Sequence, residues 1–169
     1  MTSYYEHIET PVGDLRIAVD EAGRLCRVAF LSEAARRGHD PAERGARRGG
    51  AADAAAAQLR EYFDGQRREF DLPLALEGSD FQRKVWRALL DVPYGATASY
   101  GEIARRIGAP LKARAVGRAN GDNPIPIVVP CHRIIGSDGA LTGYGGGLHV
   151  KRYLLELEAS TGSLPLPGT

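Results

Sequence analysis

Cysteines are scarce in this sequence and long apolar runs are missing. Two cysteines cannot form a disulfide framework, and no segment reaches the ~18 consecutive apolar residues of a membrane-spanning helix. The first residues contain neither a basic segment nor an apolar stretch of the kind that opens a secretory signal. We therefore expect a cytoplasmic protein with reduced thiols and no membrane partner.

Close-spaced metal ligands are lacking too. His7, Cys26 and His39 include no pair at the spacing of a zinc site, so we expect no metal and no cofactor. Cys26 lies on the apolar phase of an alternating segment, residues 24–30, and is expected in the core. A hydrophobic content of 43% is enough to build such a core in one or two small domains.

An excess of charge of one sign is absent as well, because the net charge is +1 over 169 residues. The distribution is less even than the average. Between Tyr100 and Ile134 the only acidic residues are Glu102 and Asp122, whereas the bases are Arg105, Arg106, Lys112, Arg114, Arg118 and Arg133. This local excess predicts a compact DNA-binding face.

The first part of the chain predicts a small α/β domain. Alternating segments separated by turn residues favour an antiparallel meander, and they are residues 4–9, 15–20 and 24–30. Residues 32–51 are rich in Arg, Gly, Ala and Glu without a period, which predicts an exposed, mobile loop; contact of its arginines with DNA is the less favoured alternative. A helix over 52–62 and an extended segment over 70–76 follow.

The second part predicts short helices. Ser79 is a favourable N-cap for one helix, and Ser99 caps another over residues 100–107, with Glu102 placed to complete a capping box. A Gly-containing turn leads to a helix over 111–120, so the pair has helix-turn-helix proportions. An ordinary αα-hairpin is the alternative.

The helix over 111–120 alternates small residues with arginines. Arg114 and Arg118 share one face, and Gly117 inside the helix costs up to about 1 kcal/mol relative to Ala. Close approach to DNA would offset that cost. Tight helix packing with solvated arginines is the alternative, and this segment alone does not separate the two.

Residues 125–133 are an apolar run that ends in a thiol, an imidazole and a guanidinium. They predict a buried strand that delivers Cys131 to the edge of a pocket. A cysteine beside a base indicates a nucleophile, because the thiolate attacks carbon. Neighbours on a strand point to opposite faces, so contact between Cys131 and His132 requires a turn or a bridging water. An inert buried thiol is the alternative.

These motifs together resemble a known family. The segments Asn123-Pro124, Pro130-Cys131-His132-Arg133, Gly143-Tyr144-Gly145-Gly146-Gly147-Leu148 and Leu154-Leu155-Glu156-Leu157-Glu158 are similar to the active-site block of the O6-alkylguanine-DNA alkyltransferases. The resemblance continues upstream through residues 81–104, and more weakly through 58–74.

The resemblance implies an α+β fold with two domains. A ribonuclease-H-like α/β support domain is expected over residues 1–76. A helix-turn-helix, winged-helix-like domain that carries the DNA-binding and active-site residues is expected over 79–160, and a frayed tail over 161–169.

The implied reaction moves an alkyl group from O6-alkylguanine, and also O4-alkylthymine, in DNA to the protein's own cysteine. Nucleotide flipping precedes the transfer, and the protein is used once. By resemblance, Cys131 is the acceptor, His132 deprotonates it through a water, Glu158 orients the imidazole, and Asn123 links the recognition helix to the cysteine loop. Glu156 is the competing carboxylate.

The resemblance also implies a DNA face and a base pocket. Arg114 takes the place of the flipped nucleotide and Tyr100 pushes the adjoining phosphate, while Ala113, Ala115 and Arg118 complete the DNA face. The pocket is assigned to Tyr100, Ile134, Tyr144, Gly145 and Pro126. The carbonyls of Cys131 and Ile134 are expected to accept from the base. Asn120 and Thr142 are positions that the resemblance does not fix, so the range of alkyl groups stays open.

The expected partner is double-stranded DNA bearing O6-alkylguanine, bound by a monomer, with clustering on DNA left open. Two other functions remain. A Cys-His hydrolase would turn over, and a non-enzymatic alkylguanine-binding protein of the alkyltransferase-like kind would lack the acceptor. The presence of Cys131 argues against the second.

Overall fold

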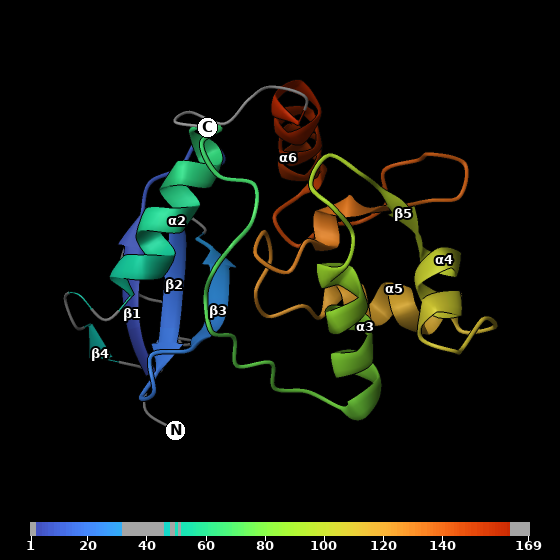
Figure 1. Ribbon diagram of the computed structural model, residues 1–169, viewed down its shortest axis with the longest axis horizontal. Helices are drawn as coiled ribbons and strands as arrows, with labels where there is room; N and C mark the ends of the chain where they lie inside the picture. The colour runs from blue at the N-terminus through green and yellow to red at the C-terminus, as the bar shows by residue number, and fades with distance from the viewer. Residues whose placement is uncertain (1–2, 32–45, 48–49, 51, 163–169) are drawn as a thin grey trace. The chain divides into compact units, whose positions relative to one another are not determined.

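The computed structural model describes residues 3–31, 46–47, 50 and 52–162. The chain divides into two compact units, Met1–Ala75 and Leu76–Thr169, each described separately below (Figure 1). The α+β class predicted from the sequence is confirmed. In the described part of the chain, no helix combines the length and apolar character needed to cross a membrane.

The first unit is built on a four-stranded sheet. Its strands are β1 (Ser3–Ile8), β2 (Leu15–Asp20), β3 (Leu25–Phe30) and β4 (Ala46–Arg47), in the order β3-β2-β1-β4. The antiparallel meander of β1 to β3 is confirmed. β4 pairs parallel to β1 and was not predicted, because its segment has no hydrophobic period. The rest of the predicted 32–51 loop, residue 50 apart, lies outside the described residues.

Helix α2 (Asp53–Phe63) covers one face of this sheet (Figure 1). Its Leu59 and Tyr62 are fully buried, as are Leu15 and Ile17 of β2, so helix and sheet share one core. The segment 70–76 forms only a single bridge, between Leu74 and Leu25, rather than an extended strand. The first unit is therefore a small two-layer α/β domain, with one helix packed on one sheet.

Cys26 is half-buried, so its predicted core position is wrong. The pairing of β2 with β3 shifts at this point, because Ala18 pairs with Arg27 and Val19 with Leu25. Cys26 is therefore the extra residue of a β-bulge, which breaks the alternation on which the prediction depended. Its Sγ donates to the carbonyl of Ala18 at 3.3 Å.

The second unit is mostly helical. Its elements are α3 (Asp80–Leu90), α4 (Tyr100–Arg106), α5 (Ala113–Gly121), α6 (Leu148–Thr161) and a parallel pair of short strands, β5 (Ala98–Ser99) and β6 (Ile134–Ile135). α6 ends at Thr161, so the predicted tail begins inside a helix. Residues 163–169 of that tail lie outside the described residues.

The helix starts differ in their caps. At α3, Ser79 and Gln82 form a complete capping box. At α4, Ser99 Oγ accepts from the Glu102 N–H at 3.1 Å, but the predicted return bond from the Glu102 side chain is not made. Ser99 is also the last residue of β5, where it pairs with Ile135.

The pair α4 and α5 packs on α3 in helix-turn-helix order. Trp86 of α3 is buried, and its Nε1 donates to the carbonyl of Ala119 on α5 at 2.8 Å. Ile103 of α4 and Val116 of α5 are fully buried in the same core. α5 begins at Ala113, two residues later than predicted, because the Lys112 N–H closes a turn on Ala109 O at 2.9 Å. The outer side of α5 is left facing solvent.

Candidate active site

The predicted strand over residues 125–131 does not form. The segment makes one isolated bridge, between Pro126 and Val129, and the short strand β6 follows only at Ile134. Prolines remove the N–H donors that a strand ladder needs, and three of them stand here, at 124, 126 and 130. The segment is a loop rather than a strand.

This loop is held in one conformation. Ile127 has φ +74°, the one non-glycine residue with positive φ in the described part of the chain. That conformation is unfavourable for a β-branched residue and persists only where the surroundings enforce it. Ile127 is fully buried, and the Val129 N–H donates to Ile125 O at 2.9 Å across it.

Cys131 opens a 3₁₀ turn, Cys131–Arg133. The Arg133 N–H closes it on Pro130 O at 3.0 Å. The turn supplies the break in strand geometry that contact between adjacent Cys and His side chains requires. Both side chains are buried, with exposed fractions of 4% for Cys131 and 0% for His132.

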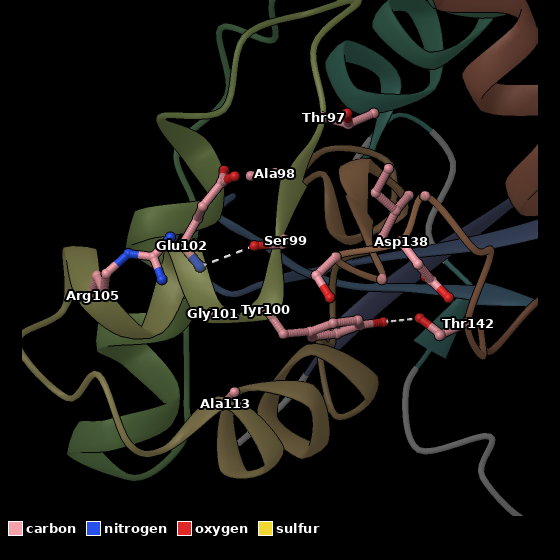
Figure 2. Close-up of a pocket in the computed structure, with 14 residues that line it drawn as sticks. Thr97, Ala98, Ser99, Tyr100, Gly101, Glu102, Arg105, Ala113, Asp138 and Thr142 are labelled. Carbon is pink, nitrogen blue, oxygen red and sulfur yellow. Dashed lines mark hydrogen bonds between the residues drawn. The ribbon is translucent and has the colours of Figure 1, made fainter.

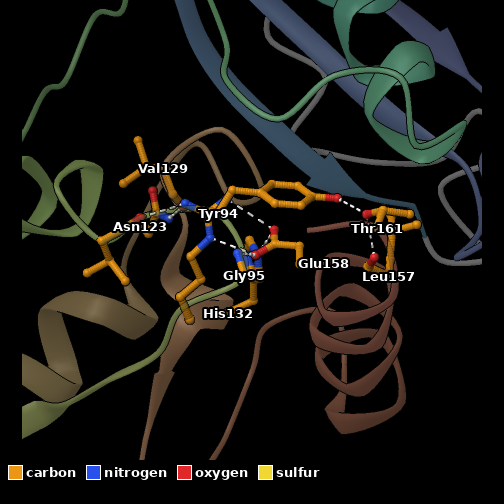
Figure 3. A network of polar contacts seen from close by, with 10 residues as sticks. Tyr94, Gly95, Asn123, Val129, His132, Leu157, Glu158 and Thr161 are labelled. Atoms are coloured by element: carbon orange, nitrogen blue, oxygen red, sulfur yellow. Dashed lines mark hydrogen bonds and ion pairs between the residues drawn. The ribbon is translucent and has the colours of Figure 1, made fainter. Parts of the chain in front are cut away.

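Two asparagines connect α5 to the cysteine loop. The Asn123 amide spans it, because Nδ2 donates to Val129 O at 2.8 Å and Oδ1 accepts from the Ile125 N–H at 2.9 Å (Figure 3). Asn120 Nδ2 lies 3.4 Å from Cys131 O. The Asn123 side chain also hydrogen-bonds the Cys131 thiol. The end of α5 and the cysteine are therefore fixed to each other.

His132 and Glu158 form a buried pair. His132 Nε2 lies 2.7 Å from Glu158 Oε2 of α6 (Figure 3). A carboxylate only accepts, so Nε2 of the neutral imidazole carries the proton and Nδ1 is left basic. Nδ1 is buried without a hydrogen-bond partner in the described part of the protein. The competing carboxylate, Glu156, is exposed.

Arg133 clamps the same carboxylate. Its Nε donates to Glu158 Oε1 at 2.8 Å, its Nη2 to Oε2 at 3.1 Å, and its Nη1 to Val92 O at 2.7 Å. The Gly95 N–H adds a longer bond to Oε1, at 3.4 Å. Arg133 is buried, so its prediction as part of the surface DNA face is wrong. The number of charges along the sequence does not show that the Arg133 guanidinium is paired with Glu158.

Burial sets the protonation states of the site. It raises the pKa of the Cys131 thiol to about 11, although the Asn123 bond and the Lys151 charge lower it. Burial lowers the pKa of His132 below its ordinary value, against the raising effect of Glu158. Burial also raises the pKa of Glu158, but His132 and Arg133 outweigh this and hold it at about 2. At neutral pH the resting site holds a thiol, a basic imidazole and a carboxylate.

Tyr144 lies beside the thiol. Burial raises the pKa of its phenol, with further contributions from the charges of Cys131 and Glu158. Gly145, the next residue, is exposed. The Ile134 carbonyl accepts from Lys151 Nζ at 2.5 Å, and the Cys131 carbonyl accepts from both Asn120 Nδ2 and the Ile134 N–H.

The expected DNA-binding residues lie on α4 and α5. Arg114, Ala115 and Arg118 are exposed, and Ala113 is half-buried. A pocket opens beside them, and Tyr100, Ala113 and Thr142 are among its lining residues (Figure 2). The other expected base contacts do not line it, and these are Pro126, Ile134, Tyr144 and Gly145.

Sequence reasoning missed two buried charged residues, Arg133 as a partner of Glu158 and Lys151. Lys151 is fully buried and donates to Ile134 O and, at 3.1 Å, to Thr142 O. A signal for Lys151 was present, since it stands three residues before Leu154 and seven before Glu158, on the inward stripe of α6.

Comparisons with known proteins place both halves of the chain. Residues 3–76 match the family described as 6-O-methylguanine DNA methyltransferase, ribonuclease-like domain, and residues 80–160 match its DNA binding domain. The methylated-DNA–protein-cysteine methyltransferase of Mycobacterium tuberculosis is 52% identical over 162 residues, covering 93% of each chain. The protein of the same name from Methanosarcina barkeri is 50% identical over 155 residues, covering 92% of this chain and 96% of that one.

A solved structure agrees with these sequence matches. The crystal structure of Mycobacterium tuberculosis OGT in complex with DNA has a TM-score of 0.85 and 49% identity, with 94% of each chain covered. Sequence and fold therefore lead to one conclusion: the chain belongs to the methylated-DNA–protein-cysteine methyltransferase family.

Proposed function

We propose that this protein repairs O6-alkylguanine in double-stranded DNA by moving the alkyl group to Cys131, and that it is consumed in doing so. The observation that carries the proposal is the buried 3₁₀ turn, which places Cys131 next to an imidazole whose Nε2 is held by Glu158. This is the nucleophile, base and orienting-carboxylate arrangement of covalent catalysis.

The reaction requires one bond to form and one to break. The Cys131 thiol gives its proton to His132 Nδ1 through a water, and the sulfur attacks the alkyl carbon. The S–C bond forms while the C–O6 bond breaks. The electron pair of that bond goes to the purine, which takes up one proton, equal in number to the one that the thiol gave up, and remains in the DNA as guanine. The thioether has no route back to a thiol, so each molecule acts once.

The damaged base must leave the helical stack to reach a buried thiol. We assign Arg114 to the space left by the flipped nucleotide and Tyr100 to the adjoining phosphate and the base. The small residues Ala113 and Ala115 suit a helix in the minor groove, and Arg118 is placed to meet a phosphate. All except Ala113 and Tyr100 are exposed, as such contacts need.

The base pocket would be completed by Tyr144, Gly145, Pro126 and Ile134. We assign the carbonyls of Cys131 and Ile134 to the exocyclic amine of guanine; for Cys131 O this requires the base to displace one of its two present donors, Asn120 Nδ2 or the Ile134 N–H. Asn123 keeps the cysteine loop attached to the recognition helix. O4-alkylthymine is proposed as a second substrate, and the acting form as a monomer.

The deciding experiment is a mass measurement on intact protein. Reduced protein is mixed with excess duplex oligonucleotide that contains one O6-methylguanine, and the protein should gain one methylene in mass (CH₂) and then stop. The added mass should map to the peptide that contains Cys131. Cys131→Ala should gain nothing but still bind the duplex, whereas Cys26→Ala, which removes the other thiol, should react like the wild type.

Other outcomes would select the other functions. Continued release of product beyond one equivalent would indicate a hydrolase. Binding without any mass gain in the wild type would indicate an alkylguanine-binding protein. Methyl found on Cys26 would contradict the assignment of Cys131.

A further inference from the structure

Tyr100 is hydrogen-bonded to a residue that lies far from it in the sequence. Its phenol oxygen pairs with Thr142 Oγ1, from the loop after β6, and both residues line the pocket beside α4 and α5 (Figure 2). Either oxygen is able to act as the donor. Tyr100 is the first residue of α4, so the bond joins the helix-turn-helix to the loop that leads into the glycine-rich segment.

Both partners of this bond are fixed by further contacts. The Thr142 carbonyl accepts from Lys151 Nζ at 3.1 Å, and the same ammonium group donates to Ile134 O next to the cysteine turn. The Tyr100 ring lies on α5 at Gly117, where an added Cβ would be 3.6 Å from two ring carbons. The phenol is thus fixed between α5 on one side and an anchored hydroxyl on the other.

We propose that Thr142 is a positioning residue for alkyl transfer, acting through Tyr100. The proposal rests on the function proposed above, in which Tyr100 contacts the flipped base. When Thr142 donates to the phenol oxygen, the single phenolic proton is free to point at a ring nitrogen of the purine. Hydrogen bonds in such a chain polarise one another, so Tyr100 becomes the stronger donor.

This matters at the step where the C–O6 bond breaks. The electron pair moves onto the purine, and a donor to the ring stabilises that charge more in the transition state than in the ground state. The phenolic proton stays on Tyr100 as a hydrogen bond, so no extra acid or base is required. A purely structural role is less consistent with the location, because a bond between exposed hydroxyls competes with water and adds little stability.

The test compares single-turnover rates at saturating duplex that contains O6-methylguanine. Thr142→Val keeps the shape and removes the hydroxyl, and Thr142→Ser restores it. Each change is made in the wild type and in Tyr100→Phe, which lacks the phenolic group. Loss of one hydrogen bond is worth about 1 kcal/mol, so Thr142→Val should slow the saturated rate about fivefold with little change in half-saturating DNA concentration. Thr142→Ser should return to within about twofold of the wild type.

The double variant separates positioning from structure. If Thr142 acts through the phenol, Thr142→Val should slow Tyr100→Phe by less than about twofold. An equal slowing in both backgrounds, or a Ser variant as slow as Val, would overturn the proposal. A wild type that fails to gain alkyl mass would instead overturn the proposed function. Transfer at full rate by Thr142→Val would overturn the positioning role of Thr142 and leave the proposed function intact.

Discussion

His132 is poised as a base at neutral pH because two opposing effects act on it. Burial lowers its pKa, and contacts with Glu158 only partly reverse this, while the charges of Arg133 and Lys151 lower it further. The imidazole is therefore neutral at pH 7, with its proton on Nε2 and with no hydrogen-bond partner for Nδ1 among the described residues. The Cys131 thiol is instead protonated at pH 7, because burial raises its pKa to about 11, so it needs a base to become a thiolate.

The pH dependence of repair should show that His132 acts as the base and Cys131 as the protonated nucleophile. In the wild type, the single-turnover rate should rise as pH increases through the lowered pKa of His132 and should be level from about pH 7 to 9. In His132→Gln no base remains, so the rate should follow the thiolate fraction and rise about tenfold per pH unit up to about pH 10.

The charged and titratable groups that face the site are Glu158 and Lys151 of α6, Arg133, and Tyr144, and all four are present in both the wild type and His132→Gln, so a difference between the two profiles belongs to His132. The exposed His149→Gln is the matched control and should keep the level profile. A His132→Gln profile as level as the wild type would contradict a base role for His132.

The reach of sequence reasoning at this scale depends on whether a residue's role is local. Cys131 and His132 stand side by side in the sequence, so their pairing was open to inspection. The ion pair of Arg133 with Glu158 joins residues 25 positions apart, and no pattern in either segment predicts that pairing. Lys151 differs, because a lysine on the inward stripe of a helix is itself a signal of a buried partner.

At the scale of elements, hydrophobic periodicity predicts strands and helices, and prolines and a β-bulge account for places where the structure differs. The three long strands and helix α2 follow from their apolar spacing, whereas the starts of α3 and α4 follow from the serines that cap them. The cysteine segment is as apolar as a strand, but its prolines leave too few donors for a ladder. β4 and the bulge at Cys26 depend on pairing with β1 and β2, which local spacing does not encode.

Gly117 in α5 is an element-level prediction. An added Cβ would meet the Tyr100 ring at 3.6 Å, an ordinary contact, so alanine fits. Gly117→Ala should therefore stabilise α5 by up to about 1 kcal/mol, seen as a melting temperature higher by about 4 °C. Repair of duplex should nonetheless slow by about three- to tenfold, because the methyl group stands against Tyr100 on the side proposed to approach DNA.

Gly121, at the end of the same helix, supplies the control. A Cβ there meets no atom of the described residues within 4 Å, so Gly121→Ala should share the stabilisation without slowing repair. Equal repair rates in both variants and the wild type would show that Gly117 is not retained for close approach.

At the scale of the whole molecule, the two units can be followed by different signals. The single tryptophan of the chain, Trp86, is buried in the second unit, so its fluorescence reports that unit alone. The sheet belongs to the first unit, apart from the short β5–β6 pair. Glu158 matters for the second unit as a whole, since its carboxylate joins α6 to the cysteine turn through Arg133 and, through that guanidinium, to Val92.

Acid should weaken the second unit through this carboxylate. The folded pKa of Glu158 is about 2, below its ordinary 4.5, so its contribution is complete above pH 4.5 and is lost as pH falls towards 2. The shift corresponds to about 3 kcal/mol. Glu158→Gln should therefore lower the free energy of unfolding by about 3 kcal/mol at pH 7, measured in urea by Trp86 fluorescence, and the difference from wild type should shrink towards zero near pH 2. The exposed neighbour Glu156→Gln should change stability by less than about 0.5 kcal/mol at either pH. A Glu158→Gln deficit that stays constant from pH 7 to pH 2 would mean that packing of the side chain, rather than its charge, holds α6 to the cysteine turn.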